Sequence, residues 1–247
     1  MPGRRILILG GTAEARVLAN LLPRHDYEPV SSLAGVTANP NRPTGQLRVG
    51  GFGGADGLAK YCRDSGIAAI IDATHPFAAQ ISRHAFEAAQ ATGLPIVRLE
   101  RPGWTEAPGD CWLRVPDIAA AVRAVPENAR VLLTIGRKEA GAFFGRTDIS
   151  GIARMIEPPL RQAPSTWTLR LARPPFLLRD ELELMRSGSI DWLVCKDAGG
   201  ESTRDKLDAA RALHVSVIMI SRPSKPKVPT VCTPEDIFHL IRYFRIT

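Results

Sequence analysis

Residues suited to anion binding stand where predicted strands end. The stretch ILILGGTAEAR (6–16) carries an apolar, β-branched run into Gly10, Gly11 and Thr12, after which a helical pattern begins. Glycines let a ligand approach the backbone closely, and free N–H groups at a helix N-terminus suit a pyrophosphate. The usual G-x-G-x-x-G spacing of dinucleotide-binding proteins is missing, so the turn could instead serve only to join a strand to a helix. Both interpretations stay open on this motif alone.

The end of the second predicted strand bears on which dinucleotide would bind. NAD-dependent proteins hold the ribose 2′-hydroxyl with an acidic residue at this point, and none stands here. Ser31 and Ser32 are found instead, with Arg42 just beyond them. Small hydroxyls and an arginine suit a 2′-phosphate, which favours NADPH over NADH as the cofactor. The alternative is that Arg42 is a solvated loop residue.

Two later segments of the first half also follow apolar strands. VGGFGG (49–54), which contains Gly51, would let a flat ligand lie against bare backbone, or it is a flexible connector. DATHPFA (72–78) puts Thr74 and His75 where a parallel sheet presents groups to a ligand. A lone histidine is more often structural than catalytic, but the position makes His75 a candidate catalytic residue.

The matching point of the second half is CKDAGGESTRDK. Lys196 ends an apolar strand, and Gly199 and Gly200 precede a helix start at which Ser202 and Asp205 are spaced as in a capping box. A cation beside a bare helix N-terminus would bind a carboxylate or a phosphate. The alternative is an ordinary loop with a lysine that faces solvent.

The first strand-to-helix turn of the second half, IGRKEAGAF, adds two more cations, Arg137 and Lys138. The first half therefore looks built for a dinucleotide, and the second half for another anionic ligand.

The elements that must position these groups occur twice. Residues 46–75 and 169–198 share the order strand, loop, amphipathic helix, short break and apolar strand, and RILILGGTAEA matches RVLLTIGRKEA. Short apolar strands that alternate with helices predict parallel sheets with helices on both faces. We predict an α/β protein of two Rossmann-like domains, residues 1–126 and 127–247, with a ligand cleft between them.

Composition narrows the function classes. The net charge is +7, but the arginines are spread along the chain without a basic tail or cluster, so we expect no nucleic-acid partner. No apolar run approaches the ~20 residues that span a bilayer, and no signal peptide is evident, so we expect no membrane association. The four cysteines are scattered without a C-x-x-C motif, which is typical of reduced thiols in a cytoplasmic protein. We expect no metal site.

Together these segments resemble the precorrin-6A reductases, NADPH-dependent enzymes of cobalamin biosynthesis. The resemblance covers nearly the whole chain and is carried by ILILGGTAEAR, SLAG, GGFGGADGLAKY, IIDATHPFA, VRLERPGW, IGRKE and KDAGGESTRDKLDAA. It implies that NADPH lies mostly on the first domain and that a tetrapyrrole with many carboxylates lies in the cleft. It also implies the reaction, which is reduction of one carbon–carbon double bond of the ring system to the dihydro product.

The resemblance also assigns residues. It places Gly10, Gly11, Thr12 and Glu14 at the phosphates of the cofactor, with DATHPFA beside them. It places the KDAGGEST loop, including Ser202 and Thr203, on the substrate side. Asp197 departs from the family pattern, because KNSGG is expected where KDAGG stands. We expect Asp197 to point away from the acidic substrate and to fix the loop.

Several alternatives remain open from the sequence. Hydride addition must be completed by a proton, which Lys196, His75 or solvent could deliver, and Lys196 could instead stabilise developing negative charge. The chain could also be a non-catalytic two-domain nucleotide-binding protein, or a Rossmann reductase of another acidic metabolite.

Overall fold

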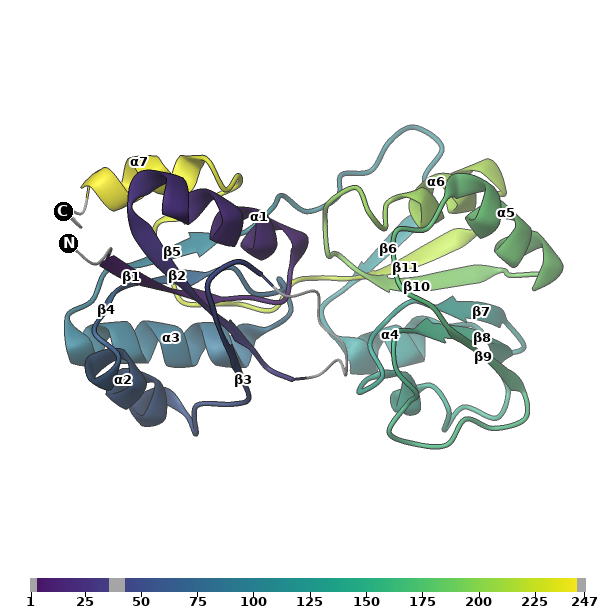
Figure 1. The fold of residues 1–247 in the computed structure, drawn as a ribbon. Helices are drawn as coiled ribbons and strands as arrows, with labels where there is room; N and C mark the ends of the chain where they lie inside the picture. The colour runs from purple at the N-terminus through teal and green to yellow at the C-terminus, as the bar shows by residue number, and fades with distance from the viewer. Residues whose placement is uncertain (1–3, 36–42, 244–247) are drawn as a thin grey trace. The chain divides into compact units, whose positions relative to one another are not determined.

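A computed structural model describes residues 4–35 and 43–243 of the chain (Figure 1). The chain divides into two compact units, Met1–Pro102 together with Ser224–Thr247, and Gly103–Pro223. Each unit contains a six-stranded sheet in which every neighbouring pair of strands is parallel. The expected α/β fold with two parallel sheets is therefore confirmed.

The first unit has the strand order β12-β5-β4-β1-β2-β3. Its elements are β1 (Arg4–Leu9), α1 (Ala13–Leu21), the 3-10 helix η1 (Leu22–His25), β2 (Tyr27–Leu33), β3 (Gln46–Val49), α2 (Ala55–Asp64), β4 (Ile67–Asp72), α3 (Ala79–Thr92), β5 (Ile96–Leu99), β12 (Thr230–Val231) and α7 (Asp236–Tyr243). This is the 3-2-1-4-5-6 order of dinucleotide-binding folds, with β12 in the sixth place. The chain reverses its direction of strand addition between β1 and β4, which is where such folds bind ligands.

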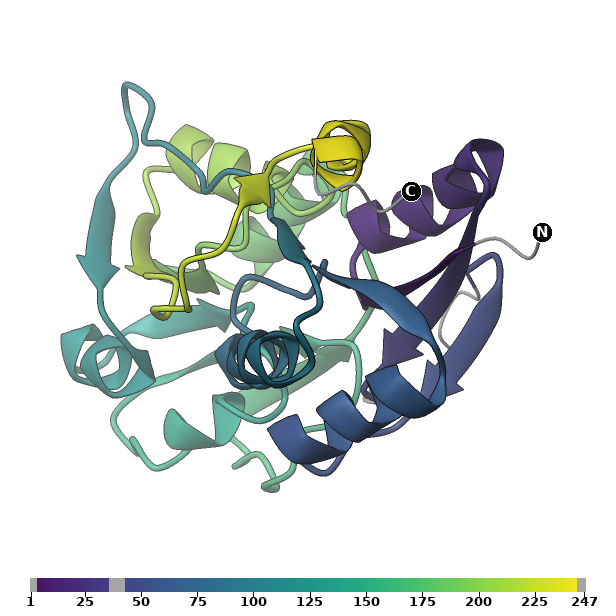
Figure 2. The ribbon, with the colours of Figure 1, turned by 90° about the vertical axis from the view of Figure 1, so that its left-hand side faces the viewer.

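Two helical layers cover this sheet. Figures 1 and 2 show α1 and α7 on one face and α2 and α3 on the other. The central strand β1 is buried on both faces, as its uninterrupted apolar run requires. Because side chains alternate along a strand, Ile6 and Ile8 pack toward α1 and α7, where Ile237 and Ile241 also lie, and Leu7 packs toward α2 and α3.

The second unit repeats this strand order as β6-β11-β10-β7-β8-β9. Its elements are β6 (Trp112–Val115), α4 (Ile118–Ala124), β7 (Arg130–Leu133), the 3-10 helix η2 (Ala140–Ala142), β8 (Ser150–Met155), β9 (Trp167–Leu171), α5 (Leu178–Ser187), β10 (Trp192–Lys196), α6 (Asp205–Ala212) and β11 (Ser216–Ile220). Figure 1 shows α5 and α6 on one face and α4 on the other. The predicted internal repeat is therefore present as a repeated strand order.

The predicted division of the chain into residues 1–126 and 127–247 needs correction. β6 precedes residue 126 but pairs with β11 of the second sheet, and β12 comes from the end of the chain but pairs with β5 of the first. Each half thus supplies the sixth strand of the other half's sheet. The chain passes from one unit to the other directly after an Arg-Pro pair in both places, at Pro102 and at Pro223.

Among the described residues, no helix combines the length and the apolar character needed to cross a bilayer.

Candidate functional site

The turn from β1 to α1 is bare backbone. Gly11 has a φ of 113°, and a side chain built there would meet no atom within 4 Å, so the turn borders open space. Thr12 is the N-cap of α1, and its hydroxyl accepts a hydrogen bond from Ala15 N at 3.1 Å. The next N–H groups of the helix start point the same way, which gives this end of the sheet the partial positive charge that suits a phosphate.

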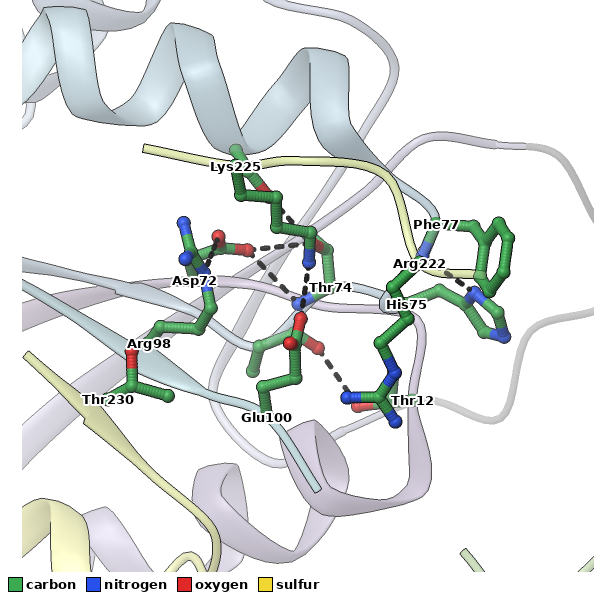
Figure 3. A network of polar contacts seen from close by, with 12 residues as sticks. Thr12, Asp72, Thr74, His75, Phe77, Arg98, Glu100, Arg222, Lys225 and Thr230 are labelled. Carbon is green, nitrogen blue, oxygen red and sulfur yellow. Dashed lines mark hydrogen bonds and ion pairs between the residues drawn. The ribbon is translucent and has the colours of Figure 1, made fainter. Parts of the chain in front are cut away.

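Hydrogen bonds join this turn to the segment that follows β4. Thr12 Oγ1 donates to the carbonyl of Ala73 at 2.9 Å, and the N–H of Ala73 donates to the carbonyl of Leu9 at 2.9 Å. Asp72 Oδ1 in turn accepts from the hydroxyl of Thr74 at 2.6 Å. Figure 3 shows Asp72 and Thr74 together in this network. The predicted residues Gly10, Gly11, Thr12 and Thr74 therefore lie together at the reversal point of the first sheet.

A buried ion pair between Asp72 and Arg98 holds the segment that follows β4 in place. Asp72 Oδ2 lies 3.0 Å from Nε of Arg98 on the neighbouring strand, and both side chains are buried. Burial alone would raise the pKa of Asp72, but hydrogen bonds from Thr74 and Ser82 oppose it. The charge of Lys225 and a hydrogen bond from Arg98 act in the same direction, and together these contacts hold the pKa below its usual value. Asp72 is therefore an ionised, buried anchor that was not singled out from the sequence.

His75 lies beyond this anchor with an exposed side chain. Its Nδ1 accepts a hydrogen bond from the N–H of Phe77 at 3.2 Å. Because one ring nitrogen of a neutral histidine accepts and the other donates, this contact leaves the proton on Nε2. A neutral ring of this kind is a base, so His75 would deliver a proton only from its imidazolium form, and its catalytic role stays a prediction.

The end of β2 carries the two predicted serines. Ser31 is buried, and its hydroxyl has no hydrogen-bond partner among the described residues. Ser32 accepts a long hydrogen bond of 3.4 Å from Nη1 of Arg48, a residue of β3. Arg42, the predicted partner of a 2′-phosphate, lies outside the described residues. Arg48 was not predicted, because it reaches Ser32 from the neighbouring strand and not from the loop that follows β2.

The loop VGGFGG after β3 borders open space at four of its glycines. Gly51 is exposed, and a side chain built there would meet no atom within 4 Å. The same is true of Gly50, Gly53 and Gly54, all of which have positive φ. The loop therefore presents backbone at the carboxyl end of β3.

Glu14, in the first turn of α1, is paired. Its carboxylate accepts hydrogen bonds of 2.9 and 3.1 Å from Nη1 of Arg101. A carboxylate at a phosphate-binding helix start would repel the ligand, and Arg101 offsets that charge. The contact indicates that Glu14 fixes the end of β5 to α1.

At the carboxyl end of the second sheet, Lys196 and Glu139 form an ion pair with Nζ 2.7 Å from Oε1. Lys196 ends β10, and Glu139 stands in the loop after β7. These are adjacent strands, so the loop returns its carboxylate to the end of the neighbouring strand. Glu139 was not predicted, although it follows directly on Arg137 and Lys138.

The other predicted cations and glycines lie around this pair in the second unit. Lys138 is exposed, while Arg137 is half-buried with its Nε lacking a hydrogen-bond partner among the described residues. Gly199 and Gly200 both have positive φ and lead into a turn that contains Ser202 and Thr203.

The prediction that Ser202 and Asp205 form a capping box at the start of the next helix is wrong. α6 begins only at Asp205, with Arg204 as its N-cap and no capping side chain. The carbonyls of Gly200 and Thr203 are instead occupied by Trp104 Nε1 and Lys206 Nζ, which hold the segment in a turn.

Asp197 fixes the loop, as expected. Its Oδ1 accepts from the backbone N–H of Trp104 at 2.8 Å, and its Oδ2 lies 3.3 Å from Nη1 of Arg114. Both oxygens are therefore engaged by structural donors of the second unit.

No cluster of three or more histidine, cysteine, aspartate or glutamate side chains that could hold a metal is found within residues 4–35 and 43–243. Two hollows in the first unit lie away from the predicted residues, one against Tyr27 and Phe238 and the other against Arg5 and Gln46. The strand ends described above remain the better candidates, since dinucleotide-binding folds use that edge.

Comparison with known proteins decides the family. The sequence profile described as precorrin-6x reductase CbiJ/CobK matches residues 5–242. The chain belongs to this family. A precorrin-6A reductase of Rhodococcus erythropolis is 49% identical over 235 residues, which is 94% of each chain. That of Sinorhizobium sp is 44% identical over 244 residues, covering 97% of this chain and 93% of the relative.

A solved structure agrees with the sequence relatives. A structure of CobK precorrin-6A reductase matches with a TM-score of 0.91 and 40% identity, over 97% of this chain and 96% of that one. The resemblance seen in the sequence and the expectation of a reductase are confirmed. The roles of individual residues, and the expected cleft between the domains, stay predictions.

Proposed function

We propose that this member of the precorrin-6x reductase family reduces a carbon–carbon double bond of precorrin-6A with NADPH, as a step of cobalamin biosynthesis. The turn Gly10–Thr12 carries the proposal for the cofactor. It combines bare backbone, a capped helix start and a place at the reversal point of a 3-2-1-4-5-6 sheet. These features fit the pyrophosphate of a dinucleotide. Thr74, which follows the neighbouring strand β4, lies beside this turn at the same edge of the sheet.

The residues of the first unit would bind and orient the cofactor. When bound, NADPH supplies a hydride from its nicotinamide ring. The N–H groups at the start of α1 would hold the pyrophosphate, and the bond from Thr12 to Ala73 would keep the turn aligned with the end of β4. The absence of a carboxylate at Ser31 and Ser32 removes the repulsion that a 2′-phosphate would meet in an NAD-type site.

The second sheet offers cations to an acidic substrate. Precorrin-6A, the substrate in the names of the relatives, is a tetrapyrrole with many carboxylates. Arg137, Lys138 and Lys196 stand at the carboxyl ends of β7 and β10 and would bind those carboxylates. The turn with Gly199, Gly200, Ser202 and Thr203 would add backbone and hydroxyl donors to the same site.

Lys196, His75 and solvent are the candidate donors of the proton that completes the reduction. Lys196 carries ammonium protons at the end of β10, where Glu139 holds it, whereas His75, after the end of β4, would donate only from its imidazolium form. Lys196 could also act by stabilising negative charge on the ring as hydride arrives.

The test is spectroscopic. Purified protein is mixed with precorrin-6A and either NADPH or NADH, and the absorbance of the reduced nicotinamide and of the tetrapyrrole is followed together. With NADPH, we expect equal molar amounts of the reduced nicotinamide and of precorrin-6A to be consumed. With NADH, we expect the reaction to be far slower. No oxidation of NADPH in the presence of precorrin-6A would overturn the proposal, and equal rates with both cofactors would overturn the 2′-phosphate part.

Two variants separate the proton donors. We expect Lys196→Ala to lower kcat at least 100-fold with little change in the Kd of NADPH, if Lys196 is the donor. His75→Asn keeps a polar side chain without an acidic proton, and a comparable loss in that variant with normal turnover in Lys196→Ala would assign the role to His75.

A further inference from the structure

Arg48 is held in a fixed position at the carboxyl end of the first sheet. In the parallel register of β2 and β3 it pairs with Ser32, and its Nη1 lies 3.4 Å from the hydroxyl of that serine. The same guanidinium donates to the carbonyls of Gly50 and Gly51, the latter at 2.6 Å. The side chain is half-buried, so its cationic group is oriented but still reached by solvent.

An aromatic ring supports one face of this guanidinium. Its central carbon lies 3.8 Å from the centre of the Phe52 ring and 5.3 Å from that of Tyr61. The rings of Phe52 and Tyr61 meet edge to face with their centres 5.4 Å apart, which fixes Phe52, in the loop after β3, against Tyr61 of helix α2. A guanidinium stacked on a ring in this way keeps its other face and part of its N–H edge for a second planar or anionic group.

The position matches the part of a dinucleotide that distinguishes NADPH from NADH. In 3-2-1-4-5-6 sheets the end of the second strand meets the ribose of the adenosine. Here Ser32 is the last residue but one of that strand, and Arg48 of β3 is its direct neighbour. An arginine binds a phosphate through several charge-assisted hydrogen bonds, and its planar face stacks on a base. The contacts among the described residues use only part of the donors of this guanidinium.

We propose that Arg48 recognises the 2′-phosphate of NADPH, and that its stack on Phe52 forms the surface on which the adenine lies. This inference rests on the proposed binding of NADPH to the first sheet. It moves the discrimination between the two cofactors from Arg42, the residue predicted from the sequence, to a residue fixed on a strand. Phosphate contact gives selectivity, whereas the stacked surface serves both cofactors equally.

Equilibrium binding tests the inference without the tetrapyrrole substrate. The Kd values of NADPH, NADH, adenosine 2′,5′-bisphosphate and adenosine 5′-monophosphate are measured by calorimetry for wild type, Arg48→Ala, Arg48→Lys and Arg42→Ala. For Arg48→Ala we expect NADPH and the bisphosphate to bind roughly 10- to 100-fold more weakly, since one charge-assisted contact is lost. NADH and the monophosphate should change by only a few-fold. Arg48→Lys should recover part of the selectivity, and Arg42→Ala should retain it.

A second variant addresses the stacked surface. Phe52→Leu removes the ring and keeps an apolar side chain. We expect it to weaken all four ligands by a similar factor of several-fold, because adenine is common to them. Melting temperatures of each variant identify any that fail to fold.

The possible outcomes distinguish a failure of the Arg48 inference from a failure of the proposal that NADPH binds the first sheet. If wild type fails to bind NADPH, both are wrong. If wild type prefers NADPH and Arg48→Ala keeps that preference, or if Arg42→Ala removes it, only the inference is wrong. An equal loss of NADPH and NADH in Arg48→Ala also overturns it, since Arg48 would then merely hold the glycine loop.

Discussion

The ammonium nitrogen of Lys196 lies 2.7 Å from Oε1 of Glu139. The two side chains come from the ends of adjacent parallel strands, and both are largely shielded from solvent. Glu139 therefore holds the Lys196 ammonium at the edge of the sheet where the predicted substrate-binding residues gather. A partner that positions a charged group in this way should affect turnover more than folding.

We predict that Glu139→Gln lowers kcat roughly tenfold with little change in the Kd of NADPH. The amide is close in size to the carboxylate but no longer holds the ammonium by charge. Lys196→Ala should lose more, and the double variant should be no worse than Lys196→Ala alone, because the two residues act as a unit. Steady-state kinetics with precorrin-6A measure this, and strictly additive losses would contradict it.

The buried pair of Asp72 and Arg98 should contribute to stability in a pH-dependent way. Asp72→Asn leaves the Arg98 charge buried without its partner, and we expect the free energy of unfolding at neutral pH to fall by about 3–5 kcal/mol. The pKa of Asp72 is lowered in the folded protein, so its stabilising effect is fully present above the usual value of 3.8.

As the pH falls below that value, the unfolded chain takes up the proton first and wild type loses this stabilisation. The difference between wild type and Asp72→Asn should therefore shrink in acid. Denaturant titrations at a series of pH values test this. A difference that stays constant down to about pH 3 would contradict the lowered pKa.

Gly57 should not tolerate a side chain. A Cβ built on this residue of α2 would lie 1.8 Å from the carbonyl oxygen of Phe52. We predict that Gly57→Ala displaces the Phe52 loop, lowers the free energy of unfolding by about 1–3 kcal/mol and weakens NADPH binding. Gly51→Ala is the matched control for stability, since a Cβ there meets no atom within 4 Å. Equal melting temperatures for the two variants would refute the steric argument.

The four cysteines should react in two classes. Cys62 and Cys195 are buried, and burial raises the pKa of each thiol to about 11. Cys111 and Cys232 are exposed. A thiol reagent at mildly alkaline pH should therefore modify the exposed pair quickly and the buried pair only after denaturation. Mass spectrometry of the modified peptides identifies them, and rapid labelling of Cys195 in the native protein would be inconsistent with this core.

Much of the fold follows from the hydrophobic pattern. Apolar runs such as Ile6–Leu9 must be buried on both faces, and their alternation with amphipathic helices leads to parallel sheets. The exchange of edge strands could not be predicted in the same way. β6 has four residues and β12 only two, and each pairs through its backbone with one neighbour. Segments this short carry too little hydrophobic pattern for the sequence alone to specify which sheet they join.

The residues of the candidate site also fall into those that the sequence predicts and those that depend on tertiary contacts. Residues that end or closely follow apolar strands, such as Thr12, Thr74 and Lys196, could be found from the rule that ligands meet the carboxyl ends of strands. Arg48 and Glu139 depend on contacts across strands. The pairing of Ser32 with Arg48 requires the register of β2 and β3, and the return of Glu139 to Lys196 requires the shape of a loop. Such relations are tertiary and carry no local signature.

The exchange of edge strands has a consequence for biosynthesis of the polypeptide itself. The first sheet stays incomplete until residues 230–243 have been made, because β12 belongs to it and Ile237 and Ile241 of α7 pack into its core. A nascent chain released at residue 126 would expose the apolar face that α7 covers. Co-translational folding of the amino-terminal half therefore cannot be completed before α7 has been made, and fragments that end near residue 126 should require chaperones or aggregate.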